Sequence, residues 1–138
     1  MEVAPMFALS MGVGMDMCFP DTCLTPVPAP TPIPYPNMAM SASTAPMAYT
    51  VLTECTPTLN MASKGLVSVG DQAGVAMGAV SHIVGGQTSY NVGCFTIMIG
   101  GAPAQRLTSV TGQNCMGVMA NGVGLCIVPS QTTLLTLG

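Results

Sequence analysis

A run of closely spaced prolines near the N-terminus is the feature that most constrains how this chain can fold. Proline removes a backbone N–H and clashes with the preceding helical turn, so a helix cannot form at this density. Between residues 26 and 36 every second residue is proline, which predicts an extended, polyproline-like conformation. A flexible linker is the simpler interpretation, whereas Ile33 and Tyr35 among the prolines favour a strap laid on an apolar surface. The prolines of this region are Pro20, Pro26, Pro28, Pro30, Pro32, Pro34 and Pro36.

Beyond residue 47 the sequence indicates short strands separated by glycine turns. Runs rich in β-branched and apolar residues occur at 51–52, 95–99 and 132–135, and each is typical of a strand. Turns are indicated at Gly85-Gly86, Gly100-Gly101 and Asn121-Gly122. We therefore predict an all-β fold.

An internal repeat gives this fold class more detail. Residues 49–63 align with residues 95–109 at a constant offset of 46, without a gap, although chance similarity in a sequence rich in Thr, Gly and Met is the alternative. A third, truncated copy lies at 130–138, where Thr133-Leu134-Leu135 matches Thr96-Ile97-Met98. A single hairpin cannot bury its own apolar face, so the copies are expected to pack around a common axis. The sequence thus predicts pseudo-threefold symmetry, which would allow one chain to sit on the end of a true trimer.

Charged residues are scarce, and this narrows the possible functions. Only seven of the 138 residues are Asp, Glu, Lys or Arg, whereas about a quarter is usual. With two basic residues, we expect no binding to nucleic acid. No apolar stretch approaches the roughly 20 residues of a membrane-spanning helix. The first residues have no basic region before an apolar one, so we expect no signal peptide.

The six cysteines leave three interpretations open. They contain no CxxC pair, so a zinc ribbon is not indicated. Scattered metal ligands, disulfides formed after export and buried thiols all remain. Catalysis has little support: His82, Asp71 and either a serine or Cys94 could be combined into a triad, but no nucleophile motif accompanies them. We therefore expect that the protein is not an enzyme.

Several motifs, in order along the chain, resemble one known family. Phe19-Pro20-Asp21-Thr22-Cys23 and Pro32-Ile33-Pro34-Tyr35-Pro36-Asn37 are similar to the opening of the PAAR-like domains, which cap the spikes of type VI secretion systems and related contractile devices. The resemblance implies a small conical protein built of hairpins. Its base would sit on a homotrimeric VgrG-type or phage central spike, one copy per trimer, and its apex would meet the target membrane. The further matching segments are 70–76, 96–104, 106–111, 113–115 and 128–135.

The resemblance also implies a metal site, from which this chain departs. In the wider PAAR family a zinc ion at the apex is held mostly by histidines with a cysteine, and this chain has one histidine. Any ligands here would be mainly thiolates, which suits tetrahedral zinc. A Cys115–Cys126 disulfide and a lone His82 that is hydrogen-bonded on a strand are the competing interpretations, and Cys55 and Cys94 could be packed thiols or a bridge. The candidate ligands are Cys23, His82, Cys115 and Cys126, with Cys18 as the replacement.

These observations lead to one functional prediction and one rival. We expect a single PAAR-like domain over 1–138, with an N-terminal segment at about 1–12, an extended strap at 18–36, repeated hairpins over 47–138 and no fused effector. It would be made in the cytoplasm and delivered at the tip of a contractile injection apparatus, of a secretion system or a phage tail, to pierce the target envelope. The alternative is a secreted, disulfide-stabilised β-module that acts as an adhesin or receptor-binding domain.

Overall fold

The computed structural model describes residues 5–26, 28–45 and 48–136. Residues 1–4 of the predicted N-terminal segment, Val27 of the strap, and residues 47 and 137–138 of the hairpin region lie outside this part. Apart from a 3-10 turn at Ser41–Ser43, the regular structure is β-strand, which confirms the all-β prediction. No helix in the described ranges is long and apolar enough to cross a membrane. The strands are β1 (Met6–Phe7), β2 (Met15–Pro26), β3 (Pro30–Met40), β4 (Thr44–Ala45), β5 (Ala48–Thr53), β6 (Thr56–Thr58), β7 (Lys64–Gly65), β8 (Ser68–Val69), β9 (Gln87–Tyr90), β10 (Cys94–Ile99), β11 (Ala102–Ala104), β12 (Val110–Cys115), β13 (Gly122–Val128) and β14 (Leu135–Thr136).

Eight strands form one sheet that closes on itself. Its order is β4-β7-β9-β12-β13-β2-β3-β8, and every pair is antiparallel. The two outer strands are continuous with inner ones, because β4 follows β3 across the 3-10 turn and β8 follows β7. Between these pairs the Leu66 N–H donates to the Ser43 carbonyl at 3.0 Å. The sheet is therefore a small barrel, and closure removes edges that would otherwise recruit other chains.

The inner face of this barrel is mainly polar. Side chains alternate along a strand, so Asp16 and Cys18 of β2 point inward and are buried, while Met15 and Met17 are half-buried on the outside. The Tyr90 hydroxyl of β9 donates to Asp16 Oδ2 at 3.0 Å and so joins strands that are not neighbours in the sheet. Glycine at 124 permits β13 to approach β2, since a Cβ there would lie 2.4 Å from the Met17 carbonyl oxygen.

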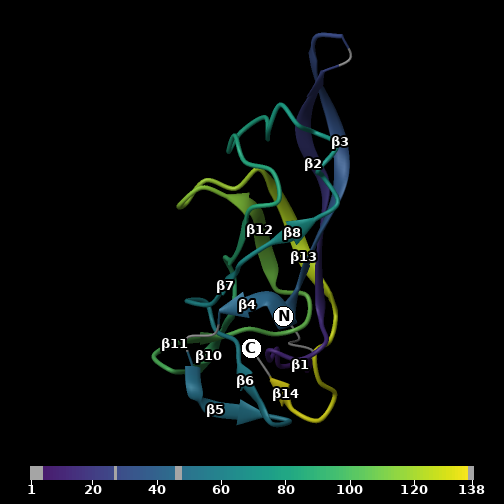
Figure 1. Cartoon of the computed structure of the whole chain (residues 1–138). Coiled ribbons are helices and arrows are strands. Elements are labelled where there is room, and N and C mark those ends of the chain that lie inside the picture. The colour runs from purple at the N-terminus through teal and green to yellow at the C-terminus, as the bar shows by residue number, and fades with distance from the viewer. Residues whose placement is uncertain (1–4, 27, 46–47, 137–138) are drawn as a thin grey trace.

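The proline-rich segment forms an exposed arm. β2 and β3 pair from Met15 and Met40 out to Pro26 and Pro30, and their tip projects beyond the barrel (Figure 1). The segment is extended as predicted and pairs with β2; its prolines are exposed, whereas Ile33 and Tyr35, on which the strap interpretation rests, are half-buried. Proline cannot donate to a ladder, so only the alternate residues Thr31, Ile33 and Tyr35 can donate to β2. The prolines therefore blunt the outer edge of β3 against further pairing.

Candidate functional site

At the end of the molecule away from the arm tip lie the short two-stranded hairpins (Figure 1). In the first, Ala48 pairs with Thr58 and Leu52 with Pro57; in the second, Cys94 pairs with Ala104 and Met98 with Pro103. Every one of these positions is shifted by 46, and the same bulge interrupts both hairpins. The repeat predicted from the sequence is therefore a structural repeat.

The hairpin turns are equivalent as well. Glu54 and Cys55 have φ of 50° and 64°, and Gly100 and Gly101 have φ of 62° and 85°. Two successive residues with positive φ are what the tight turn of a hairpin requires. Glycine adopts this conformation freely, whereas Glu54 and Cys55 adopt it at a steric cost.

The third copy is formed by the two ends of the described chain. β1 and β14 pair through Phe7 and Leu135, which corresponds to the Pro57 and Leu52 pair of the first hairpin. Residues 48–53 and 131–136 share one burial pattern, a buried residue, four exposed residues and a buried residue. In 94–99 the pattern differs only at Ile97, which is half-buried. The truncated third repeat is thus confirmed over its described residues.

Backbone hydrogen bonds join the three copies in a closed ring. The Leu9 N–H donates to the Gln105 carbonyl at 2.9 Å, Leu59 donates to Leu9 at 2.9 Å, and Gln105 donates to Leu59 at 3.1 Å. These three residues are fully buried. Three further bonds join the same copies in the opposite direction, with Met11 donating to Pro57 at 2.8 Å, Met61 to Pro103 at 2.9 Å and Leu107 to Phe7 at 2.8 Å. This cyclic pattern defines a pseudo-threefold axis.

Around this axis the three copies present matching exposed side chains. We call residues 48–53, 94–99 and 131–136 together the threefold base. The four residues between the buried ends of each copy carry no charge, and the last two of these four are aliphatic or methionine in every copy. The equivalent sets are Tyr49, Phe95 and Thr132; Thr50, Thr96 and Thr133; Val51, Ile97 and Leu134; and Leu52, Met98 and Leu135. A surface of this kind is suited to contact an apolar partner with three equal sides.

A second candidate site is a buried polar cluster near the root of the arm. Asp21 and Cys23 of β2 and Asp71, which follows β8, are fully buried, and their ligand atoms lie within 4.8 Å of one another. Three amides surround the carboxylates. Asn37 donates to Asp21 Oδ2 at 2.8 Å, Asn121 donates to Asp21 Oδ1, and Asn114 donates to both Asp21 and Asp71. The cluster therefore joins β2 and β3 to three segments distant in sequence.

Burial dominates the electrostatics of this cluster. It raises the pKa of Asp21, while hydrogen bonds from Asn121 and Asn37 partly lower it. Burial, followed by the charges of Asp21 and Asp71, raises the pKa of Cys23 to about 12. The Cys23 thiol is therefore protonated at neutral pH when no metal is bound, and it donates to Asp71 Oδ2 at 3.6 Å.

The predicted metal ligands do not meet at one point. Cys23 belongs to the cluster, and burial together with the charges of Asp21 and Asp71 raises the pKa of Cys18, the proposed replacement, to about 12. Cys115 lies beside Ser89, with Sγ and Oγ 3.1 Å apart, and Cys126 lies in an apolar core with Leu9, Leu59 and Tyr90. His82 is exposed. No disulfide joins cysteines of the described ranges, and this includes the Cys115–Cys126 bridge that was the competing interpretation.

The two carboxylates of the cluster are not among the predicted ligands, because the family resemblance implies imidazole and thiolate ligands only. Asp21 and Asp71 both lie in the motifs that carry the family resemblance, so those motifs were the available signal. Carboxylate oxygen and thiolate sulfur are zinc ligands, and Asp71 Oδ1 is buried without a hydrogen-bond partner among the described residues. The donor set therefore fits a metal ion, with the amides oriented as outer-shell donors to the carboxylates.

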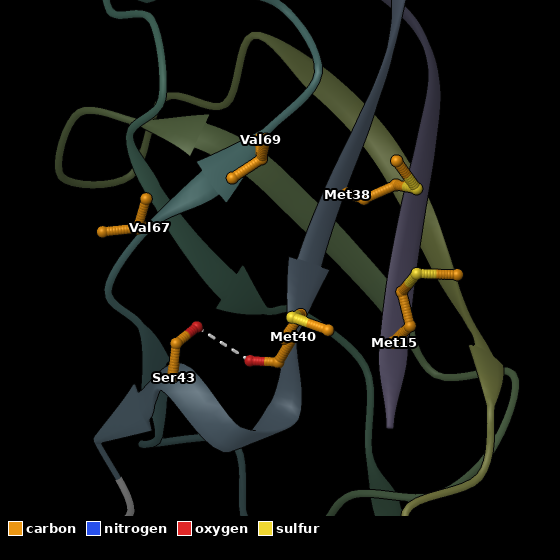
Figure 2. Close-up of a pocket in the computed structure, with 6 residues that line it drawn as sticks. All are labelled: Met15, Met38, Met40, Ser43, Val67 and Val69. Atoms are coloured by element: carbon orange, nitrogen blue, oxygen red, sulfur yellow. Dashed lines mark hydrogen bonds between the residues drawn. The ribbon is translucent and has the colours of Figure 1, made fainter. Parts of the chain in front are cut away.

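A third surface feature is an apolar groove on the outside of the barrel, with a volume of about 360 Å³. Figure 2 shows the side chains around it, which come from β2, β3, β8 and the segments beside them. Its one hydroxyl, Ser43 Oγ, already donates to the Met40 carbonyl at 2.9 Å. The lining residues are Met15, Met38, Met40, Ser43, Val67 and Val69.

The threefold base and the closed barrel define a small all-β domain that is built largely of hairpins, as the family resemblance implies. A model of the toxin PAAR-like domain family matches residues 14–120, and the chain belongs to this family. PAAR-like domains associate with spike proteins, so membership indicates a spike-associated or toxin-related role. No curated protein matches the sequence, and no solved structure matches the chain.

Proposed function

We propose that this protein caps the homotrimeric central spike of a contractile injection device, one copy per trimer. The closed ring of backbone hydrogen bonds among Leu9, Leu59 and Gln105 is the observation that supports this best. A single chain has no symmetry of its own, so three internal copies around one axis need an explanation. A partner with three identical subunits offers three equal contacts to such a surface.

In this proposal the opposite end of the molecule meets the target envelope. Residues 22–36, which form most of the arm, contain no charged side chain. Charge is costly inside a bilayer, so an uncharged arm lowers the resistance to entry. Contraction of a sheath would supply the work, and the protein would need only to stay folded and attached. The closed barrel and the buried polar cluster both serve that requirement.

We further propose zinc as the ion that the Asp21, Cys23 and Asp71 cluster would hold. Bound there, zinc would act as a structural cross-link between β2 and the segment after β8. Metal analysis of protein purified without chelators, with melting curves before and after chelation, tests this. Near-stoichiometric zinc, lost together with thermal stability in Cys23→Ser, supports it; metal-free protein that does not take up added zinc contradicts it.

The capping function is tested by stoichiometry. The full chain would be mixed with the homotrimeric spike protein of the same organism, and the complex measured by native mass spectrometry and light scattering. One chain per trimer is expected. No complex, or a complex with three chains per trimer, would contradict capping. If the protein caps a secretion-system spike but not a phage spike, or the reverse, the result would identify the kind of device.

A further inference from the structure

The first exposed position of each repeat breaks the equivalence of the base. It holds Tyr49 in the first copy, Phe95 in the second and Thr132 in the third. The two aromatic side chains are exposed to nearly the same degree, 65% and 66%. They follow equivalent buried residues, Ala48 and Cys94, at the start of the bulge that both hairpins share.

From this equivalence we infer that Tyr49 and Phe95 are the anchor residues of the contact with the spike, and that Thr132 leaves a third, identical pocket of the spike unfilled. The inference rests on the proposed capping function. Large aromatic side chains are enriched among the residues that dominate binding energy at interfaces. In the free protein an exposed aromatic ring leaves apolar surface in contact with water, so a partner that buries this surface gains binding free energy.

The partner's chemistry follows from the same geometry. A homotrimer presents each of its pockets three times, at the same distance from the threefold axis. Two of these pockets would take an aromatic ring and the third a threonine. The last exposed position of each copy is also apolar, with Leu52, Met98 and Leu135 62%, 59% and 51% exposed, so each side of the base offers further apolar contact to the same subunit. Each pocket would therefore be apolar and large enough for a phenyl ring.

Alanine substitutions test the anchors. Tyr49→Ala and Phe95→Ala are each expected to raise the dissociation constant for the homotrimeric spike by about tenfold or more, measured by calorimetry or biolayer interferometry. Phe19→Ala is the matched control, since Phe19 is 61% exposed but lies in β2, outside the base. All three changes are at exposed side chains, and melting curves would confirm that each variant folds.

A gain of affinity tests the unfilled pocket. Thr132→Phe supplies the missing ring and is expected to tighten binding by about tenfold, the effect of burying one more aromatic side chain. Binding that is unchanged by Tyr49→Ala and Phe95→Ala would overturn the anchors while leaving the capping function in place. Unchanged or weaker binding by a folded Thr132→Phe would overturn the third pocket. A wild-type chain that does not bind the trimer would instead overturn the capping function itself, and the anchors with it.

Discussion

At the residue scale, the two equivalent turns of the base offer an internal comparison. Cys55 and Gly101 occupy the same position, with φ of 64° and 85°. A left-handed conformation costs a residue with a Cβ about 1–2 kcal/mol. Glycine avoids this cost, but its greater conformational freedom stabilises the unfolded chain and offsets part of the gain. We expect Cys55→Gly to raise the free energy of unfolding by about 0.5 kcal/mol, measured by chemical denaturation.

The reciprocal change is the control. Gly101→Ala is expected to lower stability through backbone conformation alone, since a Cβ there would have no atom within 4 Å. A Cys55→Gly variant less stable than the wild type would contradict this account of the turn.

Buried carboxylates make stability depend on pH. Burial raises the pKa of Asp16 above its ordinary value of 3.8, and hydrogen bonds with Cys126 and Tyr90 lower it in part. The folded state therefore binds the proton more tightly than the unfolded state. The contribution of Asp16 to stability is greatest below pH 3.8 and is lost as the pH rises towards the raised, folded-state pKa. Burial raises the pKa of Asp21 in the same direction.

We expect the free energy of unfolding to fall as the pH rises from about 4 and then to level off. Guanidinium titrations over a pH series would measure this. Asp16→Asn, which removes the titrating group, should flatten the part of the slope that comes from Asp16. A slope that Asp16→Asn leaves unaltered would assign the pH dependence to other groups.

The metal ligands show what sequence reasoning could not reach at this scale. The motif around Cys23 was sufficient to nominate that residue, and it does lie in the cluster. Its neighbours depend on which side chains the sheet brings together, and Asp71 comes from a segment 48 residues further along the chain. Cys115 and Cys126 have equally plausible spacings, but their strands place them beside Ser89 and in the apolar core instead.

At the element scale, the sequence predicts the repeat because one constant offset relates the strand pairs of the two hairpins. Paired residues of one hairpin give the pairs of the next by adding 46. For the arm, the sequence predicts the extended conformation but not the pairing partner. Alternating proline predicts an extended chain, but whether it lies on a surface or pairs with β2 depends on the N–H groups of Thr31, Ile33 and Tyr35, which periodicity alone does not assign to a partner.

The hydrogen bonds of the buried cluster are expected to stabilise the packing between the elements that they join. Asn114 donates to Asp21 and Asp71, and its Oδ1 accepts the Gly86 N–H at 2.7 Å. Because Asn114 has a φ of 51°, Asn114→Gly removes these bonds without backbone strain. We expect it to lower the free energy of unfolding by about 3 kcal/mol, since buried carboxylates lose donors.

His82→Gly provides the comparison for that experiment. His82 also has a positive φ, 58°, but its side chain is exposed. The same type of substitution there should leave stability within about 0.5 kcal/mol of the wild type. Equal losses in the two variants, measured by chemical denaturation, would show that the amide network contributes little.

At the scale of the whole molecule, the barrel is the part that the sequence did not reveal. Closure depends on β3 and β7 each continuing into a second short strand after a bend at Ser41–Ser43 or at Leu66 and Val67. Strands of two residues, such as β4 and β8, are too short to carry a hydrophobic period. The predicted hairpin region over 47–138 therefore also contains β7, β8, β9, β12 and β13, which belong to the barrel.

The composition of the base predicts how docking responds to salt. The outward residues of all three copies are uncharged, so there is little Coulombic attraction for salt to screen. Between about 50 and 500 mM NaCl we expect the dissociation constant for the spike trimer to change less than about threefold. A change of tenfold or more would indicate that Lys64, Arg106 or acidic residues take part.

The pairing of β1 with β14 has a consequence for assembly. Because β1 and β14 come from opposite ends of the described residues, the third side of the base exists only when both strands are in place. Under the capping proposal, a chain in which β14 has not yet paired with β1 would lack one of its three contacts and would bind the trimer more weakly than the folded protein.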